Sequence, residues 1–182
     1  MQSESLRGRL LNGERVIWSG GPGQGLVLTR RDIFLVPFSL LWCGFAIFWT
    51  VGATGMGAPS FFTLWGTMFI CVGLYFVAGR FLVDAWLRRG IEYAVTDRRV
   101  LIYRPAPFSK FTAMNLSQLP DVDLIERSDG SGTIRFGQVI SMWGNRGMGA
   151  WSPSLDPTPQ FIAIKDVRRV FDLVQQSTVS RP

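Results

Sequence analysis

Three carboxylates, Asp121, Asp123 and Glu126, crowd one short segment of the chain and are the first residues whose chemistry must be weighed. In an extended strand Asp121 and Asp123 would share one face, where two carboxylates could act as an acid and a base. A solvated strand face explains the same pattern, and we favour it. Nothing in the sequence resembles a nucleophile elbow, a phosphate-binding loop or a set of metal ligands, so no enzyme is expected.

Other reactive side chains are scarce. The chain has no histidine, which removes the commonest acid/base group and metal ligand. Its two cysteines, Cys43 and Cys71, both lie in an apolar run and predict buried, inert thiols rather than a disulfide framework. The glycine-rich residues 20–25 lack a following Gly-Lys-Ser/Thr, so they predict a connector. We expect no catalytic residue, cofactor or metal site.

Basic residues offer binding chemistry instead. A cluster of them follows the apolar run: Arg80, Arg88, Arg89, Arg98, Arg99, Arg104 and Lys110. Near an anionic leaflet each such residue contributes about 1 kcal/mol of attraction, so one hypothesis is contact with lipid headgroups. The alternative is that these residues only set the topology of the chain in a membrane, and their position supports it at least as well.

A second hypothesis concerns protein partners. The stretch from Met142 to Pro159 is rich in Gly, Pro and Trp, and it contains Trp143, Met148 and Trp151. Exposed Trp and Met side chains are typical anchors of protein interfaces. They would dock the chain on a second copy or on a larger membrane complex. The same side chains could instead fill the core of the domain.

The elements that must position these residues begin with an apolar run. No Asp, Glu, Lys or Arg occurs between Asp32 and Arg80. A bilayer core about 30 Å thick needs about 20 apolar helical residues, so the run predicts two crossings. We place transmembrane helices at residues 33–53 and 61–79, joined by a connector at residues 54–60. Gly44, Gly66 and Gly73 could allow close contact between the helices.

The charge distribution predicts the orientation of this hairpin. The net charge of +6 is concentrated in residues 1–32 and 80–110, while the connector carries no charge. An excess of Lys and Arg marks the cytoplasmic side, so both termini should be cytoplasmic. A nucleic-acid-binding module would normally carry its positive charge on the folded domain, and residues 111–182 are balanced in charge. No nucleic acid is expected as a partner.

The rest of the chain is rich in β signals. Residues 16–18 hint at a short strand within a cytoplasmic leader (residues 1–32), and a juxtamembrane helix is expected at residues 80–90. Beyond it, we expect a domain of residues 91–182. Its predicted strands are residues 91–96, 99–103, 111–116, 121–127, 133–138 and 161–164. Residues 166–176 have the apolar spacing of an amphipathic helix. The sequence therefore predicts a membrane helical hairpin followed by a small antiparallel β domain capped by a helix.

The order and spacing of several segments resembles the membrane-anchored form of the bacterial PH-like domain family. The segments are Leu11–Trp18, Tyr93–Leu101, Leu119–Val122, Gly130–Gly137, and Phe161–Ile164 with the helix that follows. The resemblance implies a bent antiparallel sheet closed by a C-terminal helix. It implies little about activity, because that fold hosts lipid, peptide and self-association sites alike.

Together these features predict a multi-pass protein of the bacterial inner membrane that presents a PH-like domain at the cytoplasmic face. We expect it to serve protein assembly or scaffolding, as a homo-oligomer or in a larger membrane complex. The alternative is recognition of anionic lipid headgroups, and an enzyme of an unrecognised kind is the remote one. Membrane lipids are expected as partners in each case.

Overall fold

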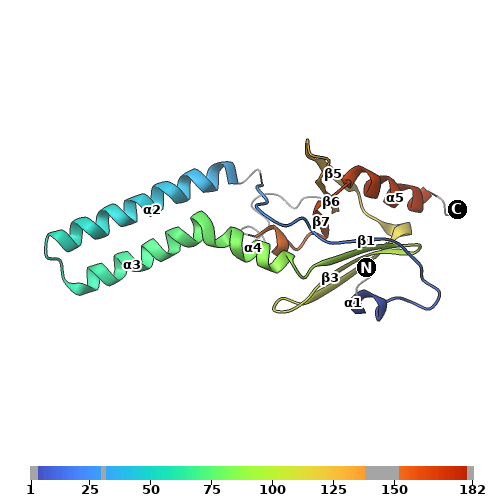
Figure 1. Ribbon diagram of the computed structural model, residues 1–182, viewed down its shortest axis with the longest axis horizontal. Helices are drawn as coiled ribbons and strands as arrows, with labels where there is room; N and C mark the ends of the chain where they lie inside the picture. The colour runs from blue at the N-terminus through green and yellow to red at the C-terminus, as the bar shows by residue number, and fades with distance from the viewer. Residues whose placement is uncertain (1–3, 30–31, 138–151, 180–182) are drawn as a thin grey trace. The chain divides into compact units, whose positions relative to one another are not determined.

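The computed structural model of this chain describes residues 4–29, 32–137 and 152–179 (Figure 1). It divides into two compact units, one of Leu26–Val83 and one of Met1–Gly25 with Asp84–Pro182. Two apolar helices, two antiparallel sheets and a C-terminal helix confirm the predicted combination of a helical hairpin and a small β region.

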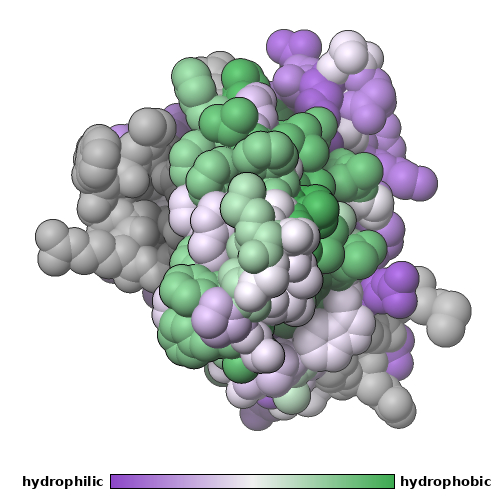
Figure 2. Space-filling model, turned by 90° about the vertical axis from the view of Figure 1, so that its left-hand side faces the viewer, coloured by the Kyte–Doolittle hydropathy of each residue, from purple (hydrophilic) through white to green (hydrophobic). Residues whose placement is uncertain are grey.

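The first unit is a helical hairpin. It contains α2 (Asp32–Gly55), α3 (Ser60–Leu74) and the π-helical turn η1 (Tyr75–Gly79), and the chain continues into α4 (Arg80–Arg88). The stretches Asp32–Gly55 and Ser60–Arg88 are long and apolar enough to cross a membrane. Most of their large apolar side chains are exposed, as the end-on view of the hairpin in Figure 2 shows. A helix that is apolar all round needs an apolar surrounding, so this surface fits lipid.

Small residues bring α2 and α3 together. A Cβ atom on Gly73 would lie 2.9 Å from the Cβ of Cys43, and one on Gly66 would collide with the side chain of Thr50. These two predicted contact glycines are therefore confirmed. A Cβ atom on Gly44 would meet no described residue within 4 Å, so its predicted role in the helix contact is wrong. Cys43 is buried in the contact, but Cys71 is exposed on α3, which corrects the prediction of two buried thiols.

The second unit contains a four-stranded antiparallel sheet in the order β1-β2-β3-β4. Its strands are β1 (Val16–Gly20), β2 (Glu92–Thr96), β3 (Arg99–Arg104) and β4 (Lys110–Asn115). The hint of a strand in the leader is thus confirmed, and that strand pairs with β2, on the far side of the hairpin in sequence. Residues 26–83 are consequently an insertion between two neighbouring strands.

A three-stranded antiparallel sheet in the order β5-β6-β7 and the C-terminal helix complete this unit. The elements are the 3₁₀ turn η2 (Leu116–Gln118), β5 (Val122–Glu126), β6 (Gly132–Phe136), the 3₁₀ turn η4 (Pro153–Leu155), β7 (Gln160–Ile164) and α5 (Val167–Val179). One core joins both sheets to α5 through Tyr93, Phe136, Phe161, Val167 and Val170, each at most 1% exposed. Within this core the ring centroids of Tyr93 and Phe161 are 4.6 Å apart.

The leader belongs to this domain. Leu6 of the short helix α1 (Glu4–Arg7) is buried against Ala94 and Leu101 of the four-stranded sheet. The ring of Trp18 in β1 lies 5.6 Å from that of Phe161 in the main core. The domain therefore starts in the leader, whereas the sequence placed its beginning at residue 91.

Candidate functional site

The two ends of the four-stranded sheet differ in what connects to them. At one end β1 finishes, β2 begins, and β3 turns into β4, as the pairs Gly20↔Tyr93, Glu92↔Tyr103 and Arg104↔Lys110 show. We call this the junction end, because the chain leaves it towards residue 26 and returns to it from residue 83. The β2–β3 turn at Asp97 and Arg98 lies at the opposite end.

Arg88, in the last turn of α4, ties the outgoing and returning chain together at the junction end. Its Nε donates to Asp84 Oδ2 at 2.8 Å, its Nη2 donates to the carbonyl of Gly25 at 2.5 Å, and its Nη1 donates to the carbonyl of Gly23. The residue is only 1% exposed. A guanidinium has a fixed fork of donors, which suits it to bridge a carboxylate and two carbonyls at once.

Asp84 completes this arrangement by binding a segment distant in sequence. Its Oδ1 accepts hydrogen bonds from Ser152 Oγ at 2.6 Å, Ser154 Oγ at 2.5 Å and the Ser154 backbone N–H at 3.0 Å. We call Asp84, Arg88 and these partners the junction network. A buried ion pair persists only when further hydrogen bonds satisfy its remaining atoms, and here they do.

A second charge cluster fixes the leader at the opposite end of the sheet. Arg99 donates from Nε and Nη2 to the two carboxylate oxygens of Glu14, both at 2.9 Å. Glu14 also accepts from Thr96 Oγ1 at 2.8 Å and from the Leu11 backbone N–H at 2.7 Å. Burial alone would raise the pKa of Glu14, but these bonds outweigh it and lower the pKa to about 2.

A third buried ion pair lies within the hairpin. Arg80 Nη1 is 2.7 Å from Asp32 Oδ1, and Arg80 Nε donates to the carbonyl of Phe76. Asp32 Oδ2 accepts from the backbone N–H and from the hydroxyl of Thr29, three residues earlier. Arg80 Nη2 has no hydrogen-bond partner among the described residues.

The predicted basic cluster is thus divided. Arg80, Arg88 and Arg99 are paired with carboxylates and largely withdrawn from solvent, so their predicted availability to headgroups is corrected. Of the seven residues in this cluster, only Arg89, Arg98 and Lys110 have exposed side chains. Arg98 lies at the opposite end of the sheet from Arg89 and Lys110. The Asp84–Arg88 spacing of four residues on one helix was the sequence signal for the buried pair.

A half-open cleft runs between β3, β4 and residues 153–160 at the junction end. Arg104 donates to the carbonyl of Phe108 in its own hairpin at 2.7 Å and, across the cleft, to the carbonyl of Ser154 at 2.6 Å, and burial lowers the pKa of its guanidinium. Lys110 Nζ lies 3.4 Å from the carbonyl of Pro157. The donors of Arg104 are committed to the backbone, which leaves Lys110 as the more available cation.

Of the remaining predicted residues, the three carboxylates that the structure describes do not form a site. Asp121 and Asp123 are exposed, and Asp123 lies opposite Arg135 in the sheet, as expected for a solvated strand face. Glu126 is 3.8 Å from Arg168 at the surface. Trp143, Met148 and Trp151 lie outside the described residues. Within the described ranges, no group of three or more Asp, Glu, Cys or His side chains could hold a metal ion.

Comparisons of the chain with protein-family models, with curated proteins and with solved structures give no match. The function must therefore be argued from the geometry of the hairpin, the junction network and the β domain.

Proposed function

We propose that this chain is a multi-pass protein of the bacterial inner membrane that presents a PH-like domain at the cytoplasmic face for protein assembly. The two apolar helices would cross the membrane as a hairpin, with both termini cytoplasmic. The domain would act by binding other proteins and would carry out no reaction.

The observation that carries the proposal is the insertion of the hairpin into the β domain. Strand β1 precedes the hairpin, β2 follows it, and the two strands pair along Val16–Gly20. Arg88 then holds the returning helix to the carbonyls of Gly23 and Gly25. A domain attached by one flexible tether could leave the membrane surface, whereas this domain is joined to the hairpin by two chain segments, and Arg88 ties these segments together where they leave the domain.

The PH-like assignment draws on the strand order. Four antiparallel strands, three further antiparallel strands and a closing helix agree with the architecture that the sequence resemblance implies. In this interpretation the hairpin replaces the turn between the first two strands.

The cytoplasmic orientation draws on the charges. Arg30, Arg31 and Arg80 flank the apolar run, and the connector between the helices has none. This orientation can be tested in intact cells with two single-cysteine variants, Gly57→Cys and Arg98→Cys. In both variants Cys43 and Cys71 are replaced by alanine. A membrane-impermeant maleimide should label position 57 at once and position 98 only after lysis. The reverse order would overturn the orientation.

Assembly is tested by purifying the full chain in mild detergent at its native expression level and weighing the intact particle. We expect a homo-oligomer or a complex of fixed stoichiometry. Chemical crosslinking in intact cells, done before solubilisation, guards against loss of partners in detergent. A monomer in both measurements would contradict the assembly function.

Recognition of anionic lipid headgroups is the second candidate. It is favoured by Arg89 and Lys110, whose exposed cations lie at the junction end of the sheet. Headgroup recognition would predict that vesicles containing phosphatidylglycerol change the solvent exposure of the Arg89 and Lys110 side chains. The solvent exposure of Arg98 should stay the same.

A further inference from the structure

The turn between β3 and β4, residues 105–109, lies at the junction end of the sheet, beside the end of α4. A Cβ atom on Gly90 would be only 2.6 Å from Pro105 Cγ, so the turn and the residue that follows α4 are in contact. Glycine is required at position 90 for this approach. The turn is thus in contact with the chain immediately after α4.

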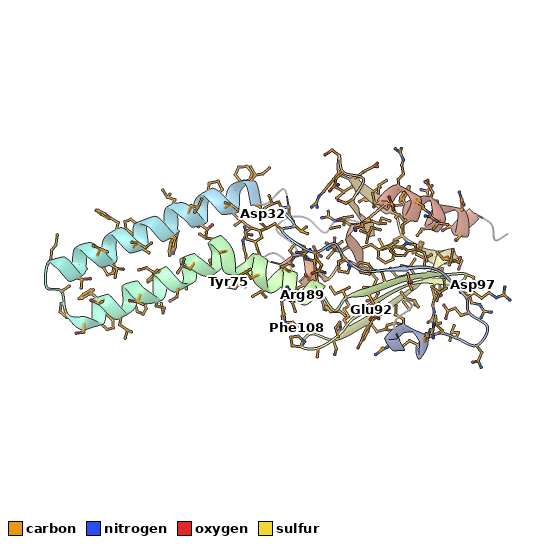
Figure 3. All side chains as sticks on the ribbon, viewed as in Figure 1. Asp32, Tyr75, Arg89, Glu92, Asp97 and Phe108 are labelled. Carbon is orange, nitrogen blue, oxygen red and sulfur yellow. The ribbon has the colours of Figure 1, made fainter. Side chains whose placement is uncertain are left out.

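Large aromatic side chains are exposed on both of these elements. Trp86 of α4 is 58% exposed and Phe108 of the turn is 43% exposed. The cations Arg89 and Lys110 follow closely in sequence, and both are exposed. Figure 3 labels Phe108 and Arg89 in this region. Aromatic rings mixed with Lys and Arg are typical of the layer where lipid headgroups meet hydrocarbon.

The length of α4 limits how far Trp86 can lie from that layer. Trp86 follows Arg80 by six residues in one helix, which corresponds to a rise of about 9 Å. Headgroup and interfacial regions add about 5–8 Å on each side of the hydrocarbon core. If Arg80 marks the inner boundary of the core, an untilted helix puts the backbone of Trp86 just beyond this layer, and a tilt of the helix brings the residue into it.

We infer that the junction end of the domain is a lipid-contacting surface, in which Phe108 and Trp86 insert among the headgroups and Arg89 and Lys110 bind their phosphates. The inference rests on the proposed function in one respect, which is that the hairpin spans the bilayer. It assigns lipid contact to residues 105–110 and to α4. Arg98 and Arg99, about 20 Å away along β3 at the usual rise of a strand, are excluded from it.

The test uses the full chain reconstituted in vesicles of phosphatidylcholine and phosphatidylglycerol, with one cysteine carrying the fluorophore NBD. Phe108→Cys is the test position and Ile125→Cys is the matched control, because Ile125 on β5 is 45% exposed and Phe108 is 43% exposed. Native Cys71, exposed on α3, reports whether the hairpin lies in lipid. In each protein the other cysteines are replaced by alanine.

We expect NBD at position 108 to emit at shorter wavelength than NBD at position 125. Spin labels near the lipid headgroups should quench it several-fold more, and aqueous iodide should quench it several-fold less. Equal quenching of positions 108 and 125 would overturn the inference. Protection from iodide without quenching by the lipid spin labels would also overturn it, because that result indicates a covering protein.

If position 71 is not quenched by labels deep in the acyl chains, the proposed membrane hairpin fails as well. Quenching at 71 but not at 108 refutes the lipid-contacting surface alone.

Discussion

Arg88 ties together the two points of the β domain at which the chain leaves for the hairpin and returns from it. Among the described residues its charge is balanced by Asp84 alone, and its other donors hold two backbone carbonyls. Replacing Arg88 with methionine keeps most of the side-chain volume but leaves the Asp84 carboxylate buried without its cation. Breaking a buried pair in this way costs about 3–5 kcal/mol, so we expect Arg88→Met to lower the thermal unfolding temperature strongly in detergent.

The matched control for this variant is Arg89→Met, one residue later, where the side chain is exposed. Surface substitutions usually change stability by less than about 0.5 kcal/mol. The double variant Asp84→Asn with Arg88→Met removes both charges and should recover part of the loss, because serine hydroxyls and the backbone can still bind the amide. Equal stability of the two single arginine variants would contradict the role of the junction network.

Glu14 makes the stability of the domain depend on pH. Burial raises its pKa, but the hydrogen bonds from Arg99, Leu11 and Thr96 prevail and lower the pKa from 4.5 to about 2. A depressed pKa in the folded state contributes stability above the unfolded pKa, and that stability is lost as the pH falls towards the folded value. The contribution is on the order of 3 kcal/mol.

Chemical unfolding of the wild type between pH 6 and pH 3 should therefore show a loss of stability that Glu14→Gln does not show. The variant is expected to be less stable at pH 6 and nearer to the wild type at pH 3. Asp123→Gln is a suitable control, because Asp123 is an exposed carboxylate on β5. If the stability of the wild type and that of Glu14→Gln changed in parallel with pH, Glu14 would have the same pKa in the folded and unfolded states.

At the scale of elements, local pattern was enough to predict most strands and helices. The alternation around Asp97-Arg98 predicted the β2–β3 hairpin, and the spacing of Val167, Val170 and Val174 predicted α5. Local pattern could not predict pairing between distant segments. Strands β1 and β2 pair with each other, but the whole hairpin separates them in sequence. For the same reason Arg99 and Arg88 were candidates for contact with lipid headgroups or for setting the topology, because their partners Glu14 and Gly23 lie more than sixty residues away in sequence.

The contact between α2 and α3 depends on single glycines. Gly73 faces the backbone of Cys43, with a Cβ position only 3.0 Å from the Cys43 Cα, so a larger side chain must push the helices apart. We expect Gly73→Leu to destabilise the hairpin by about 1–3 kcal/mol, the usual cost of overpacking. Stepwise unfolding of the full chain in a denaturing detergent, followed by circular dichroism, measures this loss.

Gly44→Leu is the control for this variant, because a Cβ atom at position 44 meets nothing within 4 Å in the part of the chain that the structure describes. The substitution replaces a weak helix former with a good one, so unchanged or increased stability is expected. A loss of stability as large as that of Gly73→Leu would indicate that Gly44 faces a partner outside the hairpin, such as a second copy of the chain.

For the whole molecule, the main consequence is that the β domain is made from two separate pieces of sequence. The sequence showed one domain beginning at residue 91, because hydropathy marks where apolar helices begin and end but not which strands pair around them. Leu6, Trp18 and Glu14 all contribute to the domain from the leader. Neither residues 1–25 nor residues 84–182 alone can complete the four-stranded sheet.

The domain should therefore fold without the hairpin only if both pieces are kept. Arg88 Nη2 lies 2.5 Å from the carbonyl of Gly25, so the ends of the two pieces are close enough for a short linker. About eight Gly and Ser residues, with a mean span of about 16 Å, can replace Leu26–Val83. We expect this protein to be soluble and to unfold cooperatively, since the core, the junction network and the Glu14–Arg99 pair all remain.

Residues 84–182 expressed alone are the decisive comparison. That fragment leaves β2 as an open edge, removes Trp18 from the core and deprives Arg99 of its carboxylate. We expect it to lack a cooperative transition in circular dichroism and to exchange its amide hydrogens quickly, while the linked protein protects the amides of β2 and β3. If the fragment instead melts cooperatively at the temperature of the linked protein, the leader is not part of the domain. In that case the hairpin is a simple N-terminal anchor, and the double attachment that supports the proposed function is lost.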